Sequence, residues 1–459
     1  MARKTSSAKK RIWGWYAFDW ASQPYNTLLI TFIFGPYVTE VLGDGSAAQA
    51  AWGYGVGAAG LVIAVLAPLI GAAADKGGQR IRWILAFSVL YTAGSAGLWL
   101  ATPDDFNLML TLCLFALGLI GMEFATIFTN AMLPTLGTRD EIGAISGSGF
   151  ALGYLGGLIA LVLMLFFFAE SASGTTLIGI APVFGLDPEM REGTRFVGPF
   201  TALWFVLFMV PFFLWVREPP RPDALPLGAA IRSAVPEFKQ TLQSLPHRPS
   251  LFSFLGASMF YRDALNGFYV FGGIYAAGVL GWTVIDVGIF GIIAVITAAV
   301  FAWIGGRADS AFGPKPVIVA CVLILTALAA MVISVSREAV FGVAIDAGSR
   351  LPDIAFYVIG AGIGAAGGAL QSASRSMMCR QAPPDQMTEA FGLYALAGKA
   401  TAFLAPLLIA VTTDITNSQS AGISPLIALF LIGLFLLVWT KPEGAEDEWT
   451  SDPASQQSA

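Results

Sequence analysis

The chain has 459 residues, of which 56% are hydrophobic and only 12% are charged, and its formal net charge is −5. A soluble domain normally carries about a quarter charged residues. The charge here is missing from whole stretches and the balance is acidic, so the composition excludes an ordinary soluble domain and argues against a nucleic-acid partner. A mean hydropathy of +0.71 predicts that the chain lies in a lipid bilayer.

Apolar stretches long enough to cross a bilayer recur along the whole sequence. A helix needs about 20 mostly apolar residues to span the hydrocarbon core. A Pro-rich connection after the sixth stretch divides the set in two, so the expected fold is an all-α integral membrane protein with two six-helix bundles. The twelve transmembrane helices are predicted at 16–41, 52–74, 82–102, 107–132, 145–169, 197–216, 251–279, 285–307, 316–335, 353–376, 387–412 and 421–440.

The positions of Lys and Arg predict the orientation. Nineteen of the 25 Lys and Arg residues fall in the termini and in the connections on one side of the membrane, and four fall in the opposite connections. Because cytoplasmic connections collect positive charge, we expect both termini in the cytoplasm. The expected parts are an N-terminal tail at 1–15, a first bundle at 16–216, a central linker at 217–250, a second bundle at 251–440 and a disordered acidic tail at 441–459.

The connection after the fifth span is long and faces outside in this orientation. It contains the sequence Asp187-Pro188-Glu189. A capping Asp followed directly by Pro is typical of a helix start. We therefore expect a short interfacial helix at this point.

A short motif occurs at equivalent places in the two halves. Residues 71–80 end the second span with Gly-x-x-x-Asp, a Gly turn and a base, and residues 305–315 repeat this pattern after the eighth span. The Asp can hold a facing base or a helix N-terminus, and such a contact would stabilise one closed conformation. The expected conformational latch comprises Gly71, Asp75, Arg80, Arg139, Gly305 and Asp309.

The first copy of this motif resembles the signature loop of the major facilitator superfamily, and the second copy resembles its weaker repeat. The resemblance implies two six-helix bundles that rock around a central site. Residues 15–22, Trp-Tyr-Ala-Phe-Asp-Trp-Ala-Ser, are similar to the start of the first span in the vacuole-effluxer-like branch. Residues 202–211 and 391–399 also resemble this branch, whereas Asp263-Ala264 departs from its usual Asp-Gly.

The vacuole-effluxer-like branch includes the autophagy-related vacuolar amino-acid effluxer and many bacterial relatives. The resemblance covers residues 11–440. It implies a multi-pass protein of a bacterial cytoplasmic membrane that acts as a monomer on a small-molecule substrate.

Ionisable side chains inside apolar spans are costly to insert and are therefore candidates for function. In the first span, Asp19, Gln23 and Asn26 share one helical face at i, i+4 and i+7. Pro24 lies between them and is expected to loosen the helix and free a carbonyl. This face is a candidate contact for substrate or protons. The alternative is that Asp19 caps the helix at the membrane interface.

The fourth span carries a second polar face. Glu123 lies near its middle, with Thr126 and Asn130 at i+3 and i+7. Glu123 is a candidate for proton coupling, and the alternative is a structural ion pair.

The seventh and eleventh spans carry the remaining candidates. Arg262 and Asp263 point about 100° apart, so we expect one to face a cavity and the other to pair across the bundle, with Asn266 nearby. Lys399 lies about twelve residues into the eleventh span and needs an anion, either a protein carboxylate or a carboxylate of the substrate.

Small residues in two spans predict close helix packing. Glycines recur every four residues at 149, 153 and 157 in the fifth span and at 360, 364 and 368 in the tenth. Arg375 follows the second series and is expected to anchor a gate or a loop at the cytoplasmic end.

The sequence offers no catalytic constellation. It has no Gly-x-x-x-x-Gly-Lys-Ser/Thr motif for nucleotide phosphates. Cys113, Cys321, Cys379 and His247 are too few and too scattered for a metal site. We therefore expect a protein that is not an enzyme and that has no metal and no cofactor.

The expected function is secondary active transport of a small polar solute by alternating access, coupled to protons. Charges of both signs within the spans favour an amino acid or a similar zwitterion. One alternative is an exporter of drugs or sugars, although Gly153-Tyr154 stands where drug antiporters often have Gly-Pro. Another is a non-transporting membrane sensor, which would need a large cytoplasmic domain that the termini and the linker are too short to form.

Overall fold

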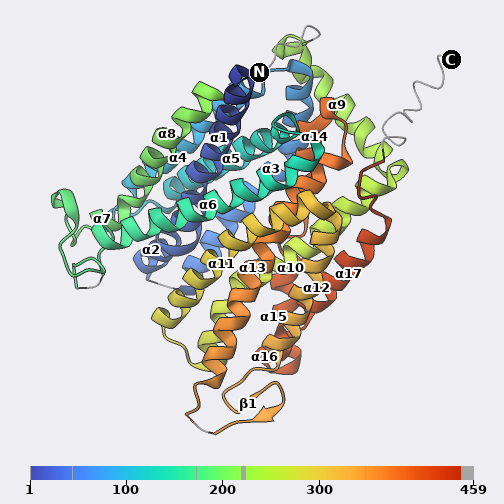
Figure 1. The fold of residues 1–459 in the computed structure, drawn as a ribbon. Helices are drawn as coiled ribbons and strands as arrows, with labels where there is room; N and C mark the ends of the chain where they lie inside the picture. The colour runs from blue at the N-terminus through green and yellow to red at the C-terminus, as the bar shows by residue number, and fades with distance from the viewer. Residues whose placement is uncertain (1, 44, 172, 219–223, 347, 446–459) are drawn as a thin grey trace. The chain divides into compact units, whose positions relative to one another are not determined.

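The computed structural model describes residues 2–43, 45–171, 173–218, 224–346 and 348–445. These residues are almost entirely helical (Figure 1). By its internal contacts the chain divides into two compact units. The first comprises residues 1–67, 74–132 and 152–227, and the second comprises residues 68–73, 133–151 and 228–459.

The helices up to residue 215 follow the first six predicted spans, with short additional turns. The longer ones are α1 (Ala2–Pro24), the π-helix η1 (Tyr25–Phe32), α2 (Phe34–Leu42), α3 (Gly45–Gly77), α4 (Arg80–Gly97), α5 (Leu108–Ala131), α6 (Arg139–Phe167) and α8 (Val197–Trp215). The short ones are η2 (Leu98–Leu100), η3 (Leu133–Thr135), η4 (Val183–Gly185) and α7 (Glu192–Arg195).

The rest of the chain adds a linker helix, the last six spans and one small hairpin. The helices are α9 (Leu227–Ser244), η5 (Leu245–His247), α10 (Pro249–Leu280), α11 (Val284–Phe312), α12 (Pro314–Ile333), α13 (Leu351–Gln381), η6 (Pro384–Gln386), α14 (Met387–Ala400), α15 (Leu404–Thr416), α16 (Gln419–Gly422), α17 (Pro425–Leu436) and η7 (Leu437–Trp439). The antiparallel strands β1 (Ala339–Val340) and β2 (Val343–Ala344) form the hairpin.

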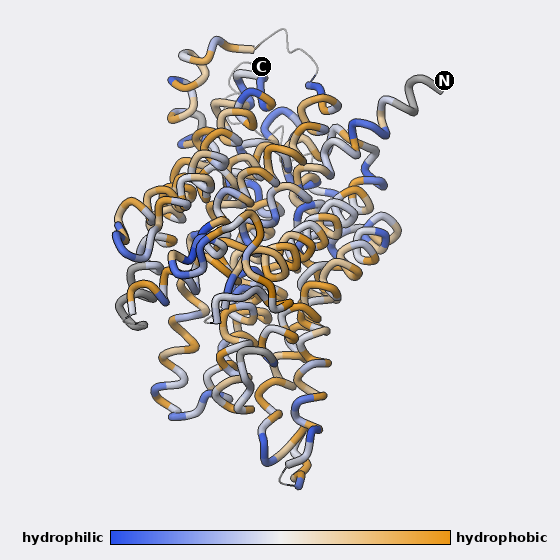
Figure 2. Tube along the Cα trace, turned by 90° about the vertical axis from the view of Figure 1, so that its left-hand side faces the viewer, coloured by the Kyte–Doolittle hydropathy of each residue, from blue (hydrophilic) through white to orange (hydrophobic). Residues whose placement is uncertain are grey.

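Ten helical segments in the described part of the chain are long and apolar enough to cross a membrane. The first and seventh expected spans are not among these ten, and they are the spans that carry Asp19 and the pair Arg262 and Asp263. Both are nevertheless mostly helical, and the first is broken at Ile33 between η1 and α2. Figure 2 shows hydrophobic residues along most of the helical length and hydrophilic residues gathered mainly near helix ends and connections. The prediction of an all-α integral membrane protein is therefore confirmed.

The first span changes its helical type at Pro24. The α-helix ends at this residue and continues as a π-helix to Phe32. Because proline has no N–H, the carbonyl of Trp20 loses its helical donor. The indole of Trp204 on α8 donates to this carbonyl instead, at 3.2 Å. The expected effect of Pro24 is thus observed, and α8 supplies the missing hydrogen bond.

The eleventh span is interrupted, which the hydropathy does not indicate. Helix α14 ends at Ala400, and α15 begins at Leu404 after a turn. Pro406 lies in the first turn of α15, where a missing N–H costs little. In a continuous helix the same proline would leave the carbonyl of Ala402 without its donor. Pro406 is therefore the sequence signal for this break.

Two connections differ from the sequence expectations. The helix expected at Asp187 is not formed. Residues 188–191 form a turn, in which Asp187 accepts a hydrogen bond from the Glu189 N–H at 2.9 Å, and the four-residue α7 begins at Glu192 as the start of the sixth span. The central linker contains α9, an 18-residue helix that the prolines of this region concealed. Residues 219–223 of the linker and 446–459 of the predicted tail lie outside the described residues.

Close packing of α11 against α13 depends on glycine (Figure 1). A Cβ atom at Gly364 or Gly368 would collide with the backbone carbonyl oxygen of Ala294 or Ala298. The predicted role of this glycine series in helix packing is thus supported by the geometry. Gly153 and Gly157 of the other series lie against α1.

We expect Gly364→Ala to lower the free energy of unfolding by about 2 kcal/mol, because rigid backbone on α11 must move to admit the methyl group. Gly362→Ala is the matched control, since its Cβ would meet only the flexible Leu328 side chain, 3.1 Å away. Thermal unfolding in detergent would compare the two variants. Equal stability losses would contradict this account.

Candidate functional site

The polar face of α1 lies along α6 within the first unit. A Cβ at Gly153 would lie 3.2 Å from the Asp19 carbonyl oxygen, and one at Gly157 would lie 2.9 Å from the Gln23 side chain. Asp19 and Gln23 are both half-buried. Because the helix becomes a π-helix at Tyr25, the α-helical spacing that placed Asn26 on this face does not extend to it.

Glu123 and Asn130 lie on the half-buried side of α5. Thr126 between them is also half-buried, whereas the neighbouring residues Met122 and Ala125 are buried. Thr126 donates its hydroxyl to the Met122 carbonyl at 2.8 Å. The structure thus places Glu123, Thr126 and Asn130 along one side of the helix, as the spacing predicts.

Arg262 lies against α14 in the second unit. Its Nη1 donates to the carbonyl oxygen of Tyr394 at 3.0 Å, and its guanidinium lies 4.2 Å from the centre of the Tyr394 ring. Gly398 allows the Arg262 guanidinium to lie close to α14, because a Cβ atom at this position would lie only 2.7 Å from Nη1. A guanidinium over an aromatic face is stabilised by cation–π attraction.

Asp263 points to a different partner, as its spacing from Arg262 predicts. The carboxylate is almost fully buried and accepts a hydrogen bond from the Ala405 N–H at 2.9 Å. Ala405 lies in the first turn of α15, whose N–H groups have no helical acceptors. A carboxylate at a helix N-terminus is stabilised by the helix dipole. Asp263 of α10 therefore caps the second half of the interrupted span.

We expect Asp263→Leu to lower the free energy of unfolding by about 1–2 kcal/mol, because it removes the only side-chain acceptor described for the first turn of α15. Asp263→Asn is the matched variant, since its amide oxygen can still accept the hydrogen bond. Hydrogen exchange of the Ala405 amide should accelerate in the Leu variant and much less in the Asn variant. Unchanged exchange in both would contradict the capping role.

Lys399 lies in the last turn of α14, directly before the interruption. Its side chain is half-buried, and a cation is favoured at a helix C-terminus by the helix dipole. On α10, Asn266 is exposed one turn beyond Arg262. Nearby on the same helix, the Tyr269 hydroxyl accepts a hydrogen bond from Gln371 of α13 at 3.3 Å. The structure therefore brings Arg262, Asp263 and Lys399 to the two half-helices of the eleventh span.

The first copy of the latch motif forms a buried ion pair. Arg80 Nη2 lies 2.6 Å from Asp75 Oδ1, and both side chains are 5% exposed. Gly71 belongs to the second unit, where it touches the start of α14: a Cβ would lie 2.7 Å from the Thr388 carbonyl oxygen. The latch role of Gly71, Asp75 and Arg80 remains a proposal.

The second copy is packed against the start of α6. Asp309 is fully buried beside Gly143, and Gly305 lies against Ala369 of α13. The Ala144 N–H donates to the hydroxyl of Ser310 at 3.0 Å.

Arg139 lies near Glu443, which we assigned to the disordered tail. Arg139 Nη1 lies 3.5 Å from this carboxylate, and the buried Arg380 guanidinium lies 2.6 Å from it. The Lys441 N–H donates to the Ser250 hydroxyl at 2.8 Å. Residues 441–443, within the stretch expected as an acidic tail, thus make specific contacts with the second unit.

Arg375, which the sequence suggests as an anchor of a gate or loop, contacts Ser146 within helix α6. Arg375 is 3% exposed, and its guanidinium donates to the Ser146 hydroxyl at 3.0 Å and to the Ser146 carbonyl at 2.7 Å. The Phe150 ring lies 4.1 Å from the guanidinium. The Ser146 hydroxyl also donates to the Ser372 carbonyl at 2.9 Å. These contacts join the first part of α6 to α13.

Ionic clusters at the opposite ends of the helices are not apparent from the sequence. In the first unit, Arg191 lies 2.7 Å from Glu40 and 3.5 Å from the buried Glu170. In the second unit, Arg337 lies 2.8 Å from Asp353, which also accepts a hydrogen bond from the Trp282 indole at 2.6 Å. Glu40 lies 151 residues from Arg191 and Trp282 lies 71 residues from Asp353, so no local spacing indicates these contacts.

With this geometry established, comparisons with known proteins identify its relatives. The family described as "Vacuole effluxer Atg22 like" matches residues 38–449. The uncharacterised MFS-type transporter YxiO of Bacillus subtilis is 25% identical over 438 residues, which cover 94% of this chain and 95% of that protein. Autophagy-related protein 22 of Cryptococcus neoformans is 24% identical over 299 residues. The alignment covers 64% of this chain and 49% of that protein, so the chain spans about half the length of the fungal relative.

Solved structures show the same fold. The proton:xylose symporter XylE matches with a TM-score of 0.67 and 13% identity, and the match covers 97% of this chain and 98% of that one. At this identity the comparison establishes the major facilitator fold alone. The relatives and the structural neighbours are transporters, and none is an enzyme.

Proposed function

Since the chain belongs to the vacuole effluxer Atg22-like family of major facilitator transporters, we propose that it moves a small polar solute by alternating access. The proposed substrate is an amino acid or a similar zwitterion, and the proposed coupling ion is the proton. We also propose that it is a monomer in a bacterial cytoplasmic membrane, with both termini in the cytoplasm. The distribution of Lys and Arg supports this orientation of the termini. The monomeric state and the membrane rest on the resemblance to bacterial members.

The observation that carries this proposal is the interrupted eleventh span with its charged residues. Discontinuous helices in transporters expose helix ends that bind charged substrate groups. Here Asp263 occupies the N-terminal end of α15, while Lys399 lies at the C-terminal end of α14 and Arg262 lies along that helix. Two cationic side chains at the ends of these half-helices are the kind of group that binds a substrate carboxylate.

The first unit supplies charge of the opposite sign. Asp19 and Glu123 are half-buried carboxylates in α1 and α5. A solute with an ammonium and a carboxylate matches a protein that carries both signs in its membrane helices, whereas a neutral sugar does not need them. Glu123 is our proposed proton-coupling group, because a carboxylate within a span can exchange a proton during a transport cycle.

Flux through purified protein in liposomes would test the proposal. Vesicles loaded with a radiolabelled mixture of amino acids should release label faster than protein-free vesicles, and a pH gradient should change the rate. Parallel vesicles loaded with a labelled sugar or with a cationic drug test the alternative substrates. Glu123→Gln should retain exchange of unlabelled for labelled solute and lose the response to the pH gradient.

Each result has a defined meaning. Flux of amino acids that responds to the gradient supports both parts of the proposal, and flux without a response removes the proton. Sugar or drug flux in the absence of amino-acid flux would overturn the proposed substrate class.

A further inference from the structure

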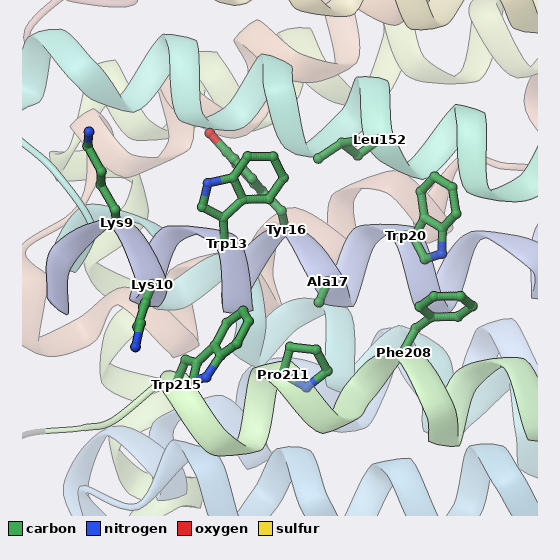
Figure 3. Close-up of a pocket in the computed structure, with 10 residues that line it drawn as sticks. All are labelled: Lys9, Lys10, Trp13, Tyr16, Ala17, Trp20, Leu152, Phe208, Pro211 and Trp215. Carbon is green, nitrogen blue, oxygen red and sulfur yellow. The ribbon is translucent and has the colours of Figure 1, made fainter. Parts of the chain in front are cut away.

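A groove on the first unit opens between α1, α6 and α8. It has a volume of about 670 Å³ (Figure 3). Its walls are aromatic: Trp13 and Trp20 come from α1, and Phe208 and Trp215 come from α8. Lys9 and Lys10 lie at the end of the groove nearest the N-terminus, and Figure 3 shows their side chains on opposite sides of α1. The candidate residues for transport lie outside this groove.

The groove adjoins an exposed apolar face of α8, which we expect to contact lipid. Trp13 is 59% exposed and Trp215 is 41% exposed. Leu203, Leu207 and Leu214 on α8 are each at least 60% exposed, and their spacing places them on one face of the helix. In a protein that spans the membrane, an exposed face of large apolar side chains faces hydrocarbon, because water contact would be costly.

The length of the groove matches one leaflet of a bilayer. From Lys10 to Trp20 the α-helix rises about 15 Å. The hydrocarbon core of a bilayer is about 30 Å thick, so one leaflet is about 15 Å. At the inner end, Trp20 lies with its ring 5.7 Å from Phe208 and 5.8 Å from Trp204, which closes the groove. An acyl chain that begins at the lysines would reach this aromatic wall.

The mouth of the groove is positively charged. Lys9 and Lys10 are exposed, and neither forms an ion pair within the part of the chain that the structure describes. The neighbouring Arg11 interacts with Glu218, so it is already partly neutralised. Lysine binds phosphate as a point charge, and basic residues beside a membrane helix attract anionic lipids.

We propose that this groove binds an anionic phospholipid of the leaflet that the N-terminus faces. The headgroup phosphate lies at the mouth of the groove, in the positive field of Lys9 and Lys10 on the two sides of α1, and one acyl chain lies along the aromatic walls as far as Trp20. This site is separate from the proposed transport residues and does not depend on the identity of the transported solute.

Titration of purified protein with lipid, followed by native mass spectrometry, tests this site. Phosphatidylglycerol is the anionic probe, and phosphatidylcholine with the same acyl chains is the zwitterionic one. We expect one phosphatidylglycerol to bind more tightly than phosphatidylcholine. The double variant Lys9→Gln/Lys10→Gln should weaken phosphatidylglycerol binding about 25-fold, from roughly fivefold for each lysine.

Two further variants separate the groove from general charge attraction. Lys76→Gln/Arg82→Gln removes the same charge from exposed positions outside the groove and should leave binding unchanged. Ala17→Trp keeps both lysines and fills the groove, so it should abolish the tight site, and Leu152→Trp does the same from α6. Equal affinity for the two lipids, equal effects of the two double variants, or intact binding in both filled variants would each overturn the proposal.

Discussion

Lys399→Ala is expected to abolish solute flux in liposomes while the protein remains folded in detergent. The half-buried ammonium at the end of α14 is the cation closest to the interruption of the span. A desolvated charge pair with a substrate carboxylate is worth about 2–5 kcal/mol, so flux should fall by about 30-fold to several thousandfold. The measurement is the initial rate of exchange of labelled solute.

Two variants accompany this experiment. Lys399→Arg keeps the charge and should recover part of the flux. Lys239→Ala removes an exposed lysine of α9 and should leave flux unchanged. Full flux in Lys399→Ala would assign the residue a structural role and would remove it from the proposed substrate site.

Arg375→Met should produce the largest loss of stability among the substitutions considered. Methionine keeps apolar volume but leaves the Ser146 hydroxyl and carbonyl without the donors that contact them at 3.0 and 2.7 Å. Hydrogen bonds to a charged group and the cation–π contact with Phe150 together contribute about 3 kcal/mol or more. Thermal unfolding in detergent should show a corresponding decrease in Tm.

Arg307→Met is the matched control for Arg375→Met. Arg307 also lies over an aromatic ring, that of Trp303, but the contact is within one exposed turn of α11. Its loss should change stability by less than about 0.5 kcal/mol. If both variants lowered Tm equally, the contact of Arg375 with α6 would have no special weight.

Hydropathy was sufficient to predict ten of the membrane helices, because most spans are apolar along their own length, whereas the charged first and seventh expected spans are not among these ten. Contacts between distant segments were not predictable in the same way. Pro406 is a sequence signal for the interruption of the eleventh span. However, Pro68 and Pro211 lie inside continuous helices, so a proline alone does not show whether a span is interrupted. The break in the eleventh span is stabilised by the Asp263 carboxylate of α10, which caps α15. This contact joins residues 142 positions apart, so it exists only in the folded chain.

The candidate site residues also show that local spacing can be inferred from the sequence, whereas contacts between distant segments cannot. The spacing suggested that one of Arg262 and Asp263 faces a cavity and the other pairs across the bundle. In the structure both contact the eleventh span, at Tyr394 and Ala405, which the sequence could not name as partners. The expected Asp19 face ends at Pro24, because the change of helix type alters the period. The anchoring role of Arg375 followed from its place at the end of a span, whereas Ser146 lies 229 residues away in sequence.

The π-helix from Tyr25 to Phe32 limits which insertions and deletions this chain can tolerate. Its i→i+5 hydrogen bonds enclose one residue more than those of an α-helix. The extra residue is thus accommodated within the π-helix itself, and a chain with one residue fewer there could close the segment as an α-helix. The later side chains of the span, including the buried Phe34 and Tyr37, would keep their orientation. Homologues with one residue fewer in this segment should therefore still bury these two aromatic residues.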